Sequence, residues 1–71
     1  MGIDVDKTGN LIYEKVVDDF GSVKKASEYL GISTNAIYNW KTRSKIPDLE
    51  NLIMISDHMG CSVNDLVVMR L

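Results

Sequence analysis

Cysteine and histidine are nearly absent from this sequence, which contains one of each, Cys61 and His58. A single cysteine excludes a disulfide within the chain and fits a reducing compartment. The two side chains could share a metal ion only with two more ligands, and no second cysteine or histidine supplies them. We therefore interpret His58 as a surface histidine on the solvent face of a helix and Cys61 as a small packed thiol at a helix corner. We expect no metal and no cofactor.

Catalytic patterns and long apolar runs are missing as well. No glycine-rich phosphate loop follows a strand pattern, and no nucleophile is paired with a general base, so we expect no catalytic residues and no enzyme. No run approaches the roughly 18 apolar residues of a membrane span. The opening stretch MGIDVDKTGN is too polar and acidic for a signal peptide. At 71 residues the sequence predicts one cytoplasmic domain that does not contact a membrane.

A net positive charge is also missing, because the chain carries a net charge of −2. The charges are unevenly distributed, however. Residues 24–45 carry five basic side chains and one acidic side chain, whereas residues 1–23 and 46–71 each have a net charge of −3. A polyanion responds to the local patch rather than to the total. The sequence therefore allows nucleic-acid binding by the middle of the chain.

Apolar residues recur with a helical period along most of the chain. Residues 1–9 lack this period, so we expect a flexible N-terminal arm there and a domain over residues 10–71. A first helix is predicted over residues 11–20, capped near Thr8 or Asn10. Further helices are predicted over 23–30, from Ser33 to about residue 42, after Ile46-Pro47-Asp48, and from Ser62. No stretch alternates like a half-buried strand. The predicted fold class is all-α with five short helices.

Glycine and serine mark the predicted helix boundaries. Glycine can end a helix in the left-handed conformation, and a serine hydroxyl can cap the next helix. This combination occurs at Gly21-Ser22, from Gly31 to Ser33 and from Gly60 to Ser62.

The inner faces of the last two helices follow from the helical period. The fourth helix should place Leu49, Leu52, Ile53 and Met59 toward the core, and the fifth helix, with a Ser62–Asp65 capping box, should bury Val63, Leu66 and Val67. The tail over residues 67–71 could continue the helix, form a short strand or lie in a subunit contact.

The stretch from Val23 to Trp40 is the most informative part of the sequence. It reads as two short helices joined at Gly31, with Ala26, Leu30, Ile37 and Trp40 on the inner faces. The second helix shows amides and hydroxyls rather than charges on its other face and is flanked by lysines. This pattern indicates a helix whose exposed amides and hydroxyls recognise the polar edge of a partner molecule.

Four segments together resemble the helix-turn-helix domain of Xre-type regulators and of the phage repressor and Cro proteins that share the lambda-repressor-like fold. They are KASEYLGIS from Lys25, AIYNW from Ala36, IPDLENL from Ile46 and GCSVNDL from Gly60. The resemblance covers about residues 11–67. Two departures stand out: Ser27 replaces the usual alanine, and the first helix carries Asp18 and Asp19 instead of basic residues.

The resemblance implies a sequence-specific DNA-binding regulator with its helix-turn-helix unit at about residues 22–42. The helix at about residues 33–42 would enter the major groove. Asparagine can bind adenine bidentately, and a threonine methyl can meet a thymine methyl. The candidate base readers are Thr34, Asn35, Tyr38 and Asn39. The candidate phosphate contacts, at helix starts and in the following loop, are Ser22, Lys24, Ser33, Lys41, Arg43 and Lys45.

The implied partner is a double-stranded DNA operator, pseudo-palindromic and bound by a homodimer, because such modules bind paired half-sites. Two alternatives stay open. The acidic first helix and apolar tail also fit a protein-interaction module, such as an antitoxin or a partner that modulates a repressor. The 71 residues could also be the amino-terminal part of a longer repressor.

Overall fold

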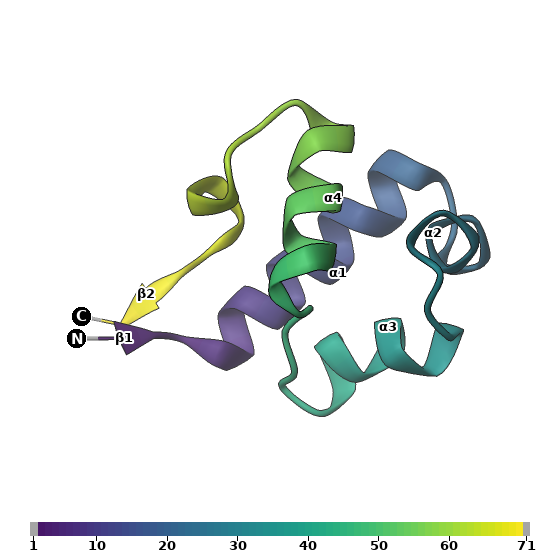
Figure 1. The fold of residues 1–71 in the computed structure, drawn as a ribbon. Coiled ribbons are helices and arrows are strands. Elements are labelled where there is room, and N and C mark those ends of the chain that lie inside the picture. The colour runs from purple at the N-terminus through teal and green to yellow at the C-terminus, as the bar shows by residue number, and fades with distance from the viewer. Residues whose placement is uncertain (1, 71) are drawn as a thin grey trace.

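The computed structural model describes residues 2–70, and these residues form a small, mainly helical domain. Figure 1 shows two short strands at one end of the molecule and α2 at the other. The predicted all-α class is confirmed, although residues 2–70 form four α-helices, one 3-10 helix and a minimal sheet in place of five helices. In chain order the elements are β1 (Gly2–Ile3), α1 (Val5–Phe20), α2 (Val23–Leu30), α3 (Thr34–Thr42), α4 (Leu49–Met59), η1 (Val63–Leu66) and β2 (Met69–Arg70).

Side-chain caps start the four α-helices. An oxygen of the residue before each helix accepts a hydrogen bond from the backbone N–H three positions on, which satisfies a donor that has no partner within the helix. The capping residues are Asp4, Ser22, Ser33 and Asp48. Gly31 ends α2 with φ 70°, as its position in the sequence predicted.

The first helix begins at Val5 and not near residue 10, so the prediction of a loose arm over residues 1–9 is wrong for the described part, residues 2–9. Asp4 is the cap, and its carboxylate accepts from the Lys7 N–H. Thr8, proposed as a cap, is buried in the second turn. Its hydroxyl donates to the Val68 carbonyl and accepts from the Val68 N–H. Contacts with distant residues therefore order a segment that lacks an apolar period.

The C-terminal segment turns back to meet the start of the chain. β2 pairs antiparallel with β1, with Gly2 opposite Arg70 and Ile3 opposite Met69. Of the three interpretations of the tail, the short strand is confirmed for residues 69–70; Leu71, like Met1, lies outside the described residues. The fifth predicted helix is only the 3-10 turn η1, where the Ser62 N–H donates to the Asp65 carboxylate.

The core lies among α1, α2, α3, α4 and η1. Its buried apolar residues are Ile12, Val16, Ala26, Leu30, Ile37, Trp40, Leu52, Ile55 and Leu66. The predicted inner face of α4 is partly wrong: Leu49 is 68% exposed and Ile53 is 45% exposed. Ile55 and Ser56 are buried instead, beside Leu52. Among the helices of residues 2–70, none combines the length and apolar character needed to span a membrane.

Gly9 allows α1 to approach the end of α3 closely. A Cβ atom placed on Gly9 would lie 2.6 Å from the Lys45 carbonyl oxygen and closer still to the Trp40 carbonyl oxygen. Both atoms belong to the backbone, so they cannot rotate away. The absence of a side chain at Gly9 is therefore a condition for the packing of α1 on α3.

Gly9→Ala should destabilise the domain by about 1–2 kcal/mol. Forcing a methyl group into a packed contact typically costs about 1–3 kcal/mol, and the better helix propensity of alanine returns no more than about 1 kcal/mol. Chemical denaturation followed by circular dichroism measures the difference. Asn10→Ala, at the next and exposed helical position, is the matched control and should change the free energy of unfolding little. Equal stability of the two variants would contradict the close approach.

Candidate nucleic-acid interface

α2 and α3 form a compact two-helix unit with a defined corner. The Ser22 hydroxyl accepts from the Lys25 N–H and begins α2. The Gly31 N–H donates back to the Ser27 carbonyl, and the Ser33 hydroxyl then accepts from the Ala36 N–H to begin α3. The predicted glycine stop and the predicted serine cap at Ser33 are therefore both confirmed. The corner fixes the direction in which α3 leaves α2.

Buried side chains hold the two helices against α1. Ala26 and Leu30 of α2 and Ile37 and Trp40 of α3 are all in the core, as predicted. On the rest of α3, Thr34, Asn35 and Tyr38 are exposed. The orientation of α3 therefore follows from apolar burial, and the polar residues of α3 are not needed for the packing.

The four candidate base readers on α3 differ in their exposure to solvent. Thr34, Asn35 and Tyr38 are exposed, and Tyr38 has 45% of its surface free. Asn39 is half-buried. The structure brings the first three together on the outer face of α3, while Asn39 lies at its edge, toward the start of α4.

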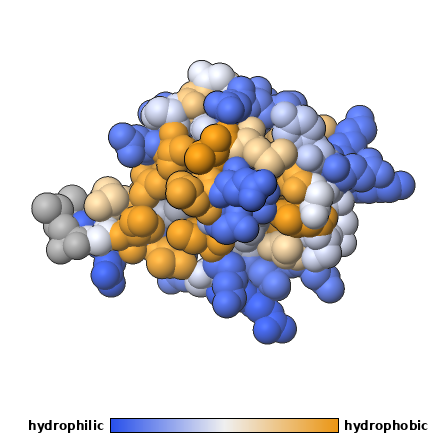
Figure 2. Space-filling model, in the orientation of Figure 1, coloured by the Kyte–Doolittle hydropathy of each residue, from blue (hydrophilic) through white to orange (hydrophobic). Residues whose placement is uncertain are grey.

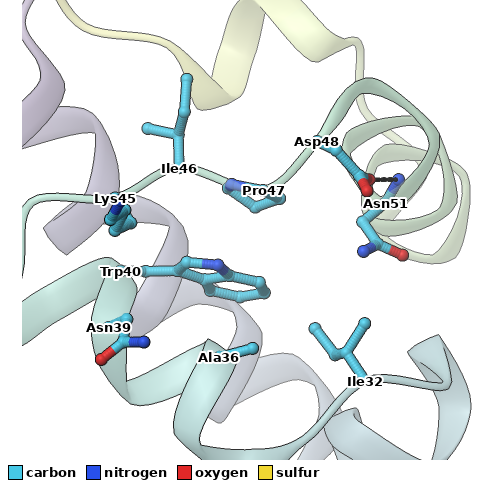
Figure 3. A pocket seen from close by; sticks show the side chains of 9 residues that line it. All are labelled: Ile32, Ala36, Asn39, Trp40, Lys45, Ile46, Pro47, Asp48 and Asn51. Atoms are coloured by element: carbon cyan, nitrogen blue, oxygen red, sulfur yellow. Dashed lines mark hydrogen bonds between the residues drawn. The ribbon is translucent and has the colours of Figure 1, made fainter.

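A hollow of about 260 Å³ separates α3 from the loop that leads into α4. Figure 3 shows Trp40 across its centre, with Asn39 and Lys45 to one side and Pro47 and Asp48 above. The apolar residues Ile32, Ala36 and Ile46 complete the lining. Asn39 therefore faces the junction between α3 and α4, and its amide borders both this hollow and the exposed face.

The candidate phosphate contacts surround α3 at both ends. Lys24 lies in the first turn of α2, Lys41 in the last turn of α3, and Arg43 and Lys45 in the following loop; all four are exposed. Ser22 and Ser33 use their oxygens as cap acceptors, which leaves each hydroxyl proton free to donate. Within residues 2–70 none of the four basic side chains forms an ion pair. Their charges are available to an external anion.

Tyr13 of α1 belongs to the same surface, although the sequence did not single it out. Its ring centroid lies 6.1 Å from that of Tyr38, and the Lys41 ammonium lies 5.3 Å from the Tyr13 ring centroid. The three groups form a tyrosine–lysine cluster where α1 crosses α3. The only signal in the sequence was a tyrosine beside Ile12, at the border of the apolar stripe of α1.

The loop after α3 is tied to the first turn of α1. The Ser44 hydroxyl donates to the Asp6 carboxylate. Ser44 adopts a φ of 52°, which lies in the left-handed region that few residues other than glycine occupy. The loop that carries Arg43 and Lys45 is therefore held by a side-chain hydrogen bond and by the neighbouring contact at Gly9.

The His58 side chain contacts three other side chains, although the sequence predicted a surface histidine on the solvent face of its helix. Its Nδ1 atom pairs with the Asp19 carboxylate, and its ring stacks on Phe20 with centroids 4.1 Å apart. Tyr29 meets the same ring edge-on at 5.0 Å. These contacts join the ends of α1, α2 and α4 on a part of the molecule separate from the tyrosine–lysine cluster. Cys61 is half-buried and packs against the core, in agreement with its interpretation as a packed thiol.

The bacteriophage CI repressor helix-turn-helix domain family matches residues 15–69. This chain is a member of that family. The matched segment contains α2, α3, α4 and η1, together with the last turns of α1. No curated protein and no solved structure gives a match.

Family membership identifies the α2–α3 unit as a helix-turn-helix and the chain as a DNA-binding regulator in general. Domains of this repressor family are typically not enzymes. Tyr13 and Gly9 lie before the matched segment, in the N-terminal part of α1.

His58→Ala should destabilise the domain by about 1 kcal/mol, because it removes the ring that stacks on Phe20 and meets Tyr29. Thermal unfolding measures the loss. Asp57→Ala, at the neighbouring exposed position of α4, is the control and should have a smaller effect. His58→Phe keeps an aromatic ring and loses the contact between Nδ1 and the Asp19 carboxylate, so it separates the two contributions. A His58→Ala variant as stable as the parent would show that the cluster adds nothing to the stability of the fold.

Proposed function

We propose that this protein is a sequence-specific repressor of the phage or prophage repressor or Cro type, and that α3 reads the operator in the major groove. The observation that carries the proposal is the coincidence of two features on one surface. The outer face of α3 has donors and acceptors but no charge at Thr34, Asn35 and Tyr38. Basic side chains without partners in the described chain lie at both ends of the helix-turn-helix.

Exposed amides and hydroxyls on a helix suit base recognition. In the major groove asparagine can donate to and accept from adenine together, and threonine can meet the thymine methyl group. Asn35 is exposed in the first turn of α3, where recognition helices of this class contact bases. Asn39 sits at the junction with α4, so we propose it as a reader at the edge of the contacted site.

The flanking groups suit the phosphate backbone. The N-terminus of α2 presents backbone N–H groups together with Ser22 and Lys24, and the N-terminus of α3 presents Ser33. Lys41, Arg43 and Lys45 lie beyond the other end of α3. Contacts of this kind set position and register and carry no sequence information of their own. The acidic first and last segments weaken non-specific attraction and leave discrimination to α3.

A homodimer on a pseudo-palindromic operator completes the proposal. A single module of this size buries little surface on DNA, and two modules related by a two-fold axis read two inverted half-sites. Such a repressor acts in the cytoplasm of a bacterium or of a phage-infected host, at the nucleoid.

A second candidate is a protein-interaction module, such as an antitoxin or a partner that modulates a repressor. The observations that favour it are the exposed apolar side chains of Leu49 and Ile53 and the acidic segments on either side of the helix-turn-helix. Purification with a bound second protein, and no salt-sensitive DNA binding, would favour this candidate over the repressor.

Asn35→Ala should reduce discrimination at one or two base positions by about 1–3 kcal/mol. The measurement is a fluorescence anisotropy titration on duplexes first selected from a random pool with the parent protein, followed by single-base variants of those duplexes. Asn39→Ala should act at a neighbouring position in the same way. Asn64→Ala, an exposed asparagine in η1, is the matched control and should bind all duplexes as the parent does. If both α3 variants discriminate between the single-base duplexes as the parent does, Asn35 and Asn39 are not base readers.

The salt dependence of binding tests the phosphate contacts. Lys41→Gln should lower the slope of log K against log salt by about 0.9, the contribution of one neutralised phosphate on duplex DNA. Tyr13→Ala should weaken binding by up to about fivefold at constant salt, because it removes the ring that positions Lys41 and Tyr38. Tyr13→Phe keeps that ring and should bind like the parent. A Tyr13→Phe variant as weak as Tyr13→Ala would instead assign a direct role to the hydroxyl group.

A further inference from the structure

We infer that Asp6 is a positioning residue of the DNA-binding surface: its hydrogen bond with Ser44 holds the loop of residues 43–45 in the conformation that contacts phosphate. The inference rests on the proposed function, because it concerns how that loop binds DNA. Asp6 lies in the first turn of α1, 38 positions before its partner in the sequence, and was not among the candidate site residues.

The end of α3 differs from the ends of the other three α-helices. α1, α2 and α4 each end at a glycine with a positive φ, namely Gly21, Gly31 and Gly60. After α3 the left-handed residue is Ser44, with φ 52°, and within residues 2–70 it is the only residue other than glycine that has a positive φ. Glycine adopts this conformation without the steric cost that a side chain brings. Serine is therefore less favourable than glycine for the backbone here, and what it adds is a hydroxyl group.

The hydroxyl group of Ser44 binds Asp6. It donates to the Asp6 carboxylate, and among residues 2–70 no basic side chain pairs with that carboxylate. A hydrogen bond to an ionised acceptor is stronger than one between two neutral groups. The contact therefore joins the left-handed turn after α3 to the first turn of α1.

The residues on either side of Asp6 are themselves held in place. The Asp4 carboxylate accepts from the Lys7 N–H, and the Asp4 N–H donates to the Val68 carbonyl over 2.8 Å. Thr8 is buried and exchanges two hydrogen bonds with Val68. The helical turn that carries Asp6 is therefore fixed to the C-terminal segment. A side chain on a fixed turn can in turn fix the loop that it contacts.

The loop that Asp6 contacts also closes the end of α3. The N–H groups of Arg43 and Lys45 both donate to the Asn39 carbonyl, over 3.0 and 3.2 Å. The left-handed turn at Ser44 brings the second of these N–H groups back toward the helix. This arrangement sets the directions in which the Arg43 and Lys45 side chains leave the backbone. Both side chains are exposed and are candidate phosphate contacts.

The charge of Asp6 opposes DNA binding, which separates its role from that of a phosphate contact. Figure 2 shows hydrophilic side chains along the lower edge of the molecule, where α3 and the loop after it lie in Figure 1. Lys41, Arg43 and Lys45 bring three positive charges there, and Asp6, bound to the intervening Ser44, brings one negative charge. A carboxylate repels DNA phosphates, most strongly at low salt. The hydrogen bond of Asp6 thus favours binding while its charge opposes it, and suitable variants separate the two effects.

Fluorescence anisotropy with a duplex that the parent protein selects from a random pool tests the inference. Asp6→Ala removes both the acceptor and the charge, and it should bind this duplex about threefold or more weakly than the parent, in line with the loss of one hydrogen bond. Asp6→Asn keeps an oxygen acceptor for the Ser44 hydroxyl and removes the charge, so it should bind at least as tightly as the parent. Asp57→Asn, at an exposed position near the end of α4, is the matched charge control and should bind like the parent.

Ser44→Gly provides the second test, because it separates stability from binding. Glycine suits the left-handed turn and lacks the hydroxyl group, so the thermal unfolding midpoint should change little while binding to the selected duplex weakens about threefold or more. A residue needed only for stability would lower the unfolding midpoint and the binding together. The double variant Asp6→Ala/Ser44→Ala should bind no more weakly than Asp6→Ala alone, because both single changes remove the same contact.

The order of the loop is measured without DNA. The steady-state heteronuclear NOE of the backbone amides at residues 43–45 should fall in Asp6→Ala and keep the parent values in Asp6→Asn. Unchanged amides in Asp6→Ala would overturn the inference. If Asp6→Ala and Ser44→Gly bind the selected duplex as tightly as the parent, the inference is also wrong, whereas the repressor proposal stands. A parent protein that binds no duplex would remove the repressor proposal and this inference together.

Discussion

The close packing of α1 on α3 is the contact on which the rest of the surface depends. Ile37 and Trp40 enter the core from α3, and Gly9 of α1 leaves room for the backbone at the end of that helix. This contact fixes α3 with its polar side outward. It also brings Tyr13 beside Tyr38 and supports the loop that carries the basic residues. Apolar burial thus holds the helix-turn-helix in place, and its polar residues remain free for a partner.

Local chemistry explains which parts of the fold could be predicted from the sequence. The stop at Gly31, the cap at Ser33 and the inward positions of Leu30 and Ile37 depend on residues only a few positions apart, and all four are as predicted. A left-handed glycine and a capping hydroxyl act within a single turn. The α2–α3 unit could therefore be predicted from the sequence alone. This unit forms the middle of the proposed site.

The remaining parts depend on contacts between distant residues. The order in residues 2–9 comes from pairing with residues 68–70, which a helical period cannot reveal. α4 has apolar residues around most of its circumference, so periodicity could not decide that Ile55 is buried and Ile53 exposed. The role of Tyr13 beside Lys41 likewise required the crossing of α1 and α3. In the site itself, the sequence identified α3 and its flanking charges but not the contribution of α1.

The outer face of α3 is polar and uncharged and has basic flanks, whereas Leu49 and Ile53 expose apolar side chains on α4. Backbone amide chemical-shift mapping on addition of a duplex of about 20 base pairs at low salt, where non-specific binding is strongest, tests this division most directly. We expect the largest changes at residues 22–25 and 33–45 and near Tyr13. Changes confined to α4 and the terminal strands, or no changes at all, would contradict it.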